Sequence, residues 1–158
     1  MRYASTNDTI AAISTPPGEG GIGIVRLSGS GAMEIAAGMF ASSKGRDICS
    51  GSQRVFHGHV HDAAGASIDE VLLHVMRGPH SYTAEDVVEF NAHGGTAPLN
   101  AILEETLRRG ARLAGPGEFT LRAFLNGRMD LTRAEAVIDL VRAKTRTALA
   151  AANATADG

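Results

Sequence analysis

Short apolar segments with the two-residue alternation of β-strands occupy much of the first two thirds of the chain. Runs rich in glycine, proline and small polar residues separate them, and such runs favour turns. Residues 63–66 lie between two alternating segments and are short enough for a hairpin turn. The pattern predicts strands at residues 9–14, 22–28, 54–62, 68–76, 86–92 and 111–114, with a loop at 42–45.

Apolar residues at helical spacing, together with glycines that stop helices, predict the remaining elements. Helices are expected at residues 32–40, 96–109 and 118–125, and a further helix begins where Thr132 and Glu135 have the spacing of a capping box. The alanine-rich residues 148–156 have little to pack against within the chain. The fold class predicted is α+β, a mixed sheet with flanking helices over residues 1–115, followed by a helical segment over residues 116–158.

Composition narrows the class of protein. The chain has 158 residues, 44% of them hydrophobic and 20% charged, which suits a soluble globular domain or a domain with part of a second. No apolar run approaches the roughly 18 residues of a membrane helix, and residues 1–8 lack the apolar stretch of a secretory signal. A lone Cys49 excludes an internal disulfide and a cysteine-based zinc site. We therefore expect a cytoplasmic protein without a membrane partner.

Charge is unevenly distributed. Residues 1–107 hold six basic and twelve acidic side chains, a net −6, whereas residues 108–158 hold nine basic and five acidic ones, a net +4. The basic segment is either an arginine-rich solvated helix or a surface for nucleic-acid phosphates. The residues that would meet phosphates are Arg122, Arg133, Arg142, Lys144 and Arg146.

Glycine is enriched, with 19 among 158 residues. Residues 18–23 fit the G-x-G-x-x-G spacing of dinucleotide sites, but that motif must open a helix and here it opens a predicted strand. We therefore expect these glycines to let two strands approach closely. A phosphate-binding G-x-x-x-x-G-K-[ST] loop is absent from the sequence.

Two charged residues lie inside predicted strands. Arg26 and Glu89 each interrupt a β-branched segment, and a partly buried charge needs an opposite charge or a ligand. They either form an internal ion pair or face one cavity and hold a polar ligand.

Histidines suggest two further sites. His57, His59 and His61 would share one face of a strand, either as zinc or copper ligands or as an exposed polar face. His93 and the two glycines after it lie where a strand passes into a helix, either as a turn or as an anion site.

Residues 8–29, 81–89, 93–95 and 116–140 form long segments in one fixed order. Together they resemble one family, the MnmE (TrmE) tRNA-modification GTPases. The resemblance departs at Ala84, where the family usually has glycine, and this slightly tightens a turn.

The resemblance implies a folate-binding and dimerisation domain over residues 1–115, similar to the folate domains of aminomethyltransferase-type proteins, and the start of a helical domain over residues 116–158. It implies 5-formyltetrahydrofolate or 5,10-methylenetetrahydrofolate as cofactor, held by Arg26, Glu89 and Arg128. GTP, potassium and magnesium would belong to a GTPase domain absent from this sequence, so this segment alone is not expected to be catalytic.

The implied partners are a second copy of the chain, the flavoprotein MnmG (GidA) and tRNA. Together they would add aminomethyl or carboxymethylaminomethyl groups to the wobble uridine. Two alternatives remain at this point, a stand-alone folate-dependent aminomethyltransferase-like enzyme and a basic tRNA-binding module.

Overall fold

A computed structural model describes residues 7–51 and 53–158, so residues 1–6, used above to argue against a secretory signal, lie outside it. Within these described residues, seven strands form one sheet in the order β3-β4-β5-β6-β2-β1-β7. All neighbours are antiparallel except β1 and β7, so the predicted mixed sheet is confirmed. The strands are β1 (Ile10–Ile13), β2 (Gly20–Ser28), β3 (Phe40–Ser42), β4 (Gln53–His61), β5 (Ser67–Met76), β6 (Val87–Gly94) and β7 (Arg112–Leu113).

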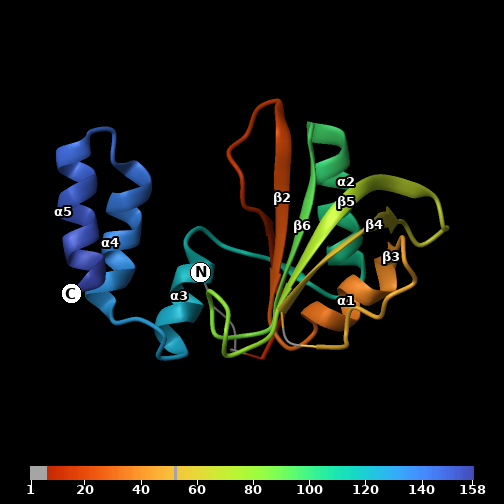
Figure 1. The fold of residues 1–158 in the computed structure, drawn as a ribbon, viewed down its shortest axis with the longest axis horizontal. Helices are drawn as coiled ribbons and strands as arrows, with labels where there is room; N and C mark the ends of the chain where they lie inside the picture. The colour runs from red at the N-terminus through yellow and green to blue at the C-terminus, as the bar shows by residue number, and fades with distance from the viewer. Residues whose placement is uncertain (1–6, 52) are drawn as a thin grey trace.

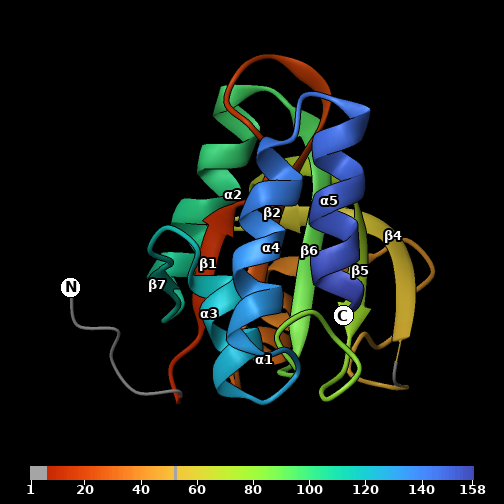
Figure 2. The same ribbon diagram turned by 90° about the vertical axis from the view of Figure 1, so that its left-hand side faces the viewer.

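Helices lie on both sides of this sheet, which confirms the α+β class. Figure 1 shows α1 and α2 against one face, with the α4–α5 hairpin beyond the opposite face, and Figure 2 shows that hairpin in front of β2 and β6. Among the described residues no helix has the length and apolar character to cross a membrane. The helices are α1 (Ala32–Met39), α2 (Thr96–Arg108), α3 (Glu118–Leu125), α4 (Leu131–Arg142) and α5 (Arg146–Asp157).

The core lies between the sheet and helices α1 and α2. Alternation along β2 buries Val25 and Leu27 completely, and the next strands add Phe90 and Leu73, which are cross-strand partners. Ile102 of α2 belongs to the same buried cluster as these strand residues. Each such side chain contributes about 1.5–3 kcal/mol on burial, so this face, rather than the opposite one, holds the fold together.

The close approach of β2 and β6 depends on Gly94 rather than, as predicted, on the glycines of residues 18–23, because a Cβ atom on Gly18 or Gly21 would meet nothing within 4 Å. A Cβ atom on Gly94 would clash with the backbone of Gly20, and one on Gly23 would clash with Leu99 of α2. Because residues 20–28 form a strand, the glycine motif does not present a helix N-terminus to a dinucleotide.

Two local predictions are wrong. Helix α4 is capped by Asp130, whose Oδ1 accepts a hydrogen bond of 2.8 Å from the Arg133 amide, and the helix begins one residue before Thr132. Residue 42, expected in a loop, and Phe40, expected in a helix, belong to β3 because they pair with β4. In the second case strand pairing overrides a local helical pattern.

The alanine-rich tail also differs from expectation. Residues 148–156 lie in α5, which packs antiparallel to α4, and Ala136 of α4 and Ala152 of α5 are both buried. Small side chains allow the two helices to approach closely. The tail therefore has a packing partner within the chain, although Ile138, Val141 and Leu149 on the hairpin stay exposed.

Alanine at position 84, where the family usually has glycine, should lower the free energy of unfolding. The turn that closes with the Ala84 amide bonded to the Ser81 carbonyl puts Ala84 at a φ of 62°. An L-residue pays about 1–2 kcal/mol for this left-handed conformation, while glycine costs about 0.5–1 kcal/mol in chain entropy. We expect Ala84→Gly to raise the free energy of unfolding by about 0.5–1 kcal/mol in urea denaturation.

The matched control for this prediction is Ala63→Gly, at an exposed hairpin position with an ordinary φ. It should leave the free energy of unfolding unchanged or lower it. Equal effects of the two substitutions would contradict the assignment of strain to Ala84.

Candidate functional site

Arg26 and Glu89 lie side by side on the sheet face that α1 and α2 leave open. They are cross-strand partners of β2 and β6, and Arg26 Nε donates to Glu89 Oε1 at 3.3 Å. Their side chains are 25% and 16% exposed. The predicted internal ion pair is therefore confirmed, and because both groups remain accessible, the pair does not exclude a ligand.

Two aromatic rings border the Arg26 guanidinium. Its central carbon lies 5.4 Å from the ring centroid of Phe119 on α3 and 5.8 Å from that of Tyr82 in the β5–β6 loop. Arg128, in the linker after α3, places its guanidinium 5.2 Å from the same Tyr82 ring. Both arginines of the predicted site thus meet at one tyrosine.

Tyr82 and Phe119 are absent from the site residues predicted from the sequence. Both lie in segments that carry the family resemblance, but a linear pattern does not show that residues 82 and 119 flank residue 26. The Tyr82 hydroxyl and Thr120 Oγ1 are hydrogen-bonded at 2.8 Å, which ties the loop to α3.

A groove of about 480 Å³ opens beside Arg26. Glu89 and Arg128 do not line it, but Glu89 contacts Arg26 and Arg128 contacts Tyr82, and both of those residues do line it. Its walls come from β1, β2, the β5–β6 loop, the turn before α3, α3 itself and α4. The lining residues are Ala12, Ile13, Ser14, Arg26, Tyr82, Ala114, Gly115, Pro116, Gly117, Phe119, Thr120, Val137 and Val141.

The three predicted site residues, Arg26, Glu89 and Arg128, carry two positive charges and one negative charge. Glu89 faces Arg26, whereas Arg128 has no carboxylate within ion-pair distance among the residues that the structure describes. A carboxylate with free lone pairs accepts two parallel N–H donors, and an unpaired guanidinium attracts an anion. The arrangement therefore suits a planar heteroaromatic ring that has an N–H edge and an anionic group.

A buried ion-pair network holds α3 against the sheet. Arg122, with a side chain 3% exposed, bonds to Asp8 and Glu85, and lies 3.7 Å from Glu118. Arg112 bridges Asp8 at 2.6 Å and Glu118 at 2.6 Å. The prediction that Arg122 meets nucleic-acid phosphates is therefore wrong, because these carboxylates surround it inside the protein.

This network lowers the pKa values of two carboxyl groups. Burial alone would raise the pKa of Asp8, but hydrogen bonds from Arg112 and Arg122 outweigh it and lower that pKa. Burial likewise opposes the arginines at Glu118, and hydrogen bonds from Arg112 and the Gly115 amide still lower its pKa.

The histidines do not form a metal centre. His57 Nε2 lies 2.5 Å from Glu70 Oε1, and the ring centroids of His57 and His59 are 6.2 Å apart. Residues 7–51 and 53–158 contain no group of three side chains that could bind a metal ion together. The alternative of an exposed polar strand face is confirmed. The hydrogen bond from His57 lowers the pKa of Glu70.

His93 lies in strand β6 rather than in the predicted turn, and its backbone amide is not free for an anion. Its backbone amide donates to one carboxylate oxygen of Asp69 at 2.9 Å, and Nδ1 lies 2.7 Å from the other. The Asp69 carboxylate therefore already accepts the hydrogen bond of the amide that a bound anion would need. The same hydrogen bond raises the pKa of His93.

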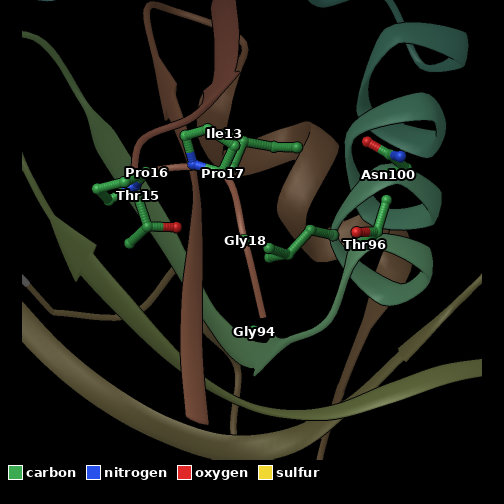
Figure 3. A pocket seen from close by; sticks show the side chains of 9 residues that line it. Ile13, Thr15, Pro16, Pro17, Gly18, Gly94, Thr96 and Asn100 are labelled. Carbon is green, nitrogen blue, oxygen red and sulfur yellow. The ribbon is translucent and has the colours of Figure 1, made fainter. Parts of the chain in front are cut away.

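A second cavity, of about 280 Å³, lies between the β1–β2 loop and the start of α2 (Figure 3). Thr15, Pro16 and Pro17 stand on one side of it, and Thr96 and Asn100 on the other. None of the nine lining residues is charged. The groove beside Arg26 is therefore the stronger candidate for a charged ligand.

Comparison with known proteins gives consistent matches. Residues 9–128 match the family described as GTP-binding protein TrmE N-terminus. The chain is 58% identical to the tRNA modification GTPase MnmE of Symbiobacterium thermophilum over 146 residues, which are 92% of this chain and 32% of that protein.

Two further relatives carry the same name. The protein of Chloroflexus aurantiacus is 57% identical over 152 residues, covering 96% of this chain and 33% of that protein. That of Moorella thermoacetica is 56% identical over 148 residues, covering 92% and 32%. The chain thus spans about a third of the length of the curated relatives it matches.

Proposed function

Since this chain belongs to the family of the TrmE N-terminus, as its sequence predicted, we propose that it is the tetrahydrofolate-binding and dimerisation module of a tRNA-modification GTPase. Residues 1–115 form the folate module, and residues 116–158 begin the helical domain. The turn at residues 115–117, directly before α3, supports this boundary. The catalytic chemistry of the whole protein requires parts that this chain does not contain.

One observation carries the ligand proposal, the Arg26–Glu89 pair beside two aromatic rings and beside Arg128, which has no carboxylate partner among the described residues. Glu89 would accept the N3–H and 2-amino donors of a pterin, whose flat ring suits the aromatic and aliphatic walls of the groove. A guanidinium would hold the pterin carbonyl or the glutamate tail. The cofactor is 5-formyltetrahydrofolate or 5,10-methylenetetrahydrofolate, and a tetrahydrofolate would supply one carbon for the modification.

The partners of the whole protein follow from the family. We infer a homodimer through the sheet face opposite α1 and α2, where Ile22, Val55 and Leu72 are 69%, 59% and 49% exposed. With MnmG (GidA), the full-length protein would add aminomethyl or carboxymethylaminomethyl groups to the wobble uridine of tRNA in the cytoplasm. GTP, magnesium and potassium would bind to the GTPase domain, outside this chain.

Calorimetric titration with 5-formyltetrahydrofolate tests the ligand proposal. We expect saturable binding by the 158-residue chain, weakened more than tenfold by Arg26→Ala and by Glu89→Ala, because each leaves the partner charge without its opposite. The control is Arg46→Ala, which removes an exposed arginine that lies outside the segments forming the groove. This variant should bind 5-formyltetrahydrofolate like the parent chain.

The outcomes are distinct. Absence of binding by the parent chain would overturn the folate proposal. Parent-like binding by both groove variants would instead place folate elsewhere on the protein. Circular dichroism of each variant would separate a lost contact from a lost fold.

A further inference from the structure

Tyr82 connects three segments that are distant in the sequence. Its ring contacts the Arg26 guanidinium of β2 and the Arg128 guanidinium of the α3–α4 linker, and its hydroxyl bonds to Thr120 of α3. The linker is itself tied to the Tyr82 loop, because Asn126 Nδ2 donates to the Thr83 carbonyl at 2.8 Å. No other described ring contacts both arginines.

We propose that Tyr82 is a positioning residue of the groove, whose ring holds Arg26 and Arg128 together as one cationic site and whose orientation the Thr120 hydroxyl sets. This inference rests on the proposed function, since it assigns a role in binding the same anionic, planar ligand. Tyr82 itself lines the groove, and so it also offers its ring to that ligand.

The physical reason lies in the charges. Two guanidinium groups repel each other, and within residues 7–51 and 53–158 Arg26 has a carboxylate partner whereas Arg128 has none. The negative face of an aromatic ring attracts both cations, and a tyrosine has few rotatable bonds to immobilise. Arg128 is otherwise exposed on a linker, so without the ring its long side chain would sample many rotamers and pay that entropy on binding.

The hydroxyl has a separate role that can be tested alone. The 2.8 Å bond to Thr120 fixes the ring relative to α3, which also carries Phe119. Removing either partner of one neutral hydrogen bond should weaken ligand binding by about two- to tenfold. Because both substitutions remove the same bond, Tyr82→Phe with Thr120→Val should be no weaker than either alone.

The experiment is calorimetric titration of 5-formyltetrahydrofolate into the parent chain, Tyr82→Ala, Tyr82→Phe, Thr120→Val and the double variant. We expect at least tenfold weaker binding by Tyr82→Ala, substantial rescue by phenylalanine, and non-additive effects of the two conservative substitutions. Phe124→Ala, which removes a partly exposed α3 ring outside the groove, is the matched control and should bind like the parent.

A spectroscopic measurement distinguishes positioning from mere structural support. The sequence has two tyrosines and no tryptophan, so in a Tyr3→Phe background Tyr82 gives the only tyrosine ring signals. With isotope-labelled tyrosine, those signals should shift on adding 5-formyltetrahydrofolate, and also when Arg128→Ala removes the cation without ligand. Unshifted ring signals at saturating ligand would overturn the proposal.

The affinities separate this inference from the proposed function. If the parent binds folate and Tyr82→Ala binds equally well, the positioning role is overturned and the folate proposal stands. If the parent does not bind folate, the folate proposal is overturned and this inference is overturned with it. Should Tyr82→Ala fail to fold, parent-like affinity of Tyr82→Phe and Thr120→Val would still overturn the role assigned to the hydroxyl.

Discussion

Replacing Arg122 with methionine is expected to lower the free energy of unfolding by about 3–5 kcal/mol, because it removes the common cation of a buried ion-pair network. Methionine keeps much of the length of the side chain, so the loss comes from charge rather than from volume. Glu118 is 2% exposed and Glu85 is 13% exposed, and neither can recover full hydration once Arg122 is gone. Urea denaturation followed by circular dichroism measures the change.

The pH profile of the same variant provides a second measurement. The pKa values of Asp8 and Glu118 are lowered in the folded protein from ordinary values of 3.8 and 4.5. A lowered folded-state pKa stabilises the protein above the ordinary value, and the stabilisation is lost as the pH falls through the folded-state value. The parent chain should therefore lose stability steadily below about pH 4.5.

In Arg122→Met this acid loss should be smaller but still present, since Arg112 continues to pair with both carboxylates. The matched control is Arg108→Met, whose arginine pairs with Glu105 but is 60% exposed while Arg109 keeps bonding to the same carboxylate. It should cost less than about 1 kcal/mol. A similar loss in both variants would contradict the role assigned to burial.

Replacing Phe90 with alanine should cost about 3–5 kcal/mol, the usual range for a fully buried phenylalanine. Phe90 is 0% exposed, lies in the strand next to β2 and pairs across the sheet with Leu73 and Val25. Its removal leaves a cavity below the strand that also carries Glu89. We therefore expect a lower urea midpoint with an unchanged denaturant slope.

Phe124→Ala is the comparison for this prediction. Phe124 is 37% exposed on α3, so the same chemical change should cost well under half as much. Thermal unfolding of the pair provides an independent check. Equal destabilisation would mean that Phe90 is not the centre of the core that the buried residues define.

Much of the secondary structure was predictable because it depends on local order. Alternation identifies β4 and β5, and the α2 helix ends before Gly110, which adopts a φ of 110° as a helix stop requires. The same alternation singled out Arg26 and Glu89 as charges inside strands. The start of α4 was harder to predict, because Asp130 and Thr132 are both good caps and the local pattern does not choose between them.

By itself, the sequence determined the α+β class, the family and the three residues Arg26, Glu89 and Arg128 as candidates for the ligand. These conclusions rest on periodicity and on ordered segments, both of which are readable along the chain. Only the tertiary structure decided that residues 26 and 89 are cross-strand partners and that Tyr82 meets both arginines.

The tertiary structure also reassigned Arg122 from a possible phosphate contact to a buried partner of Asp8, 114 positions away. Strand order and helix docking bring such residues together. These arrangements depend on which surfaces are buried together, and no short stretch of sequence contains that information.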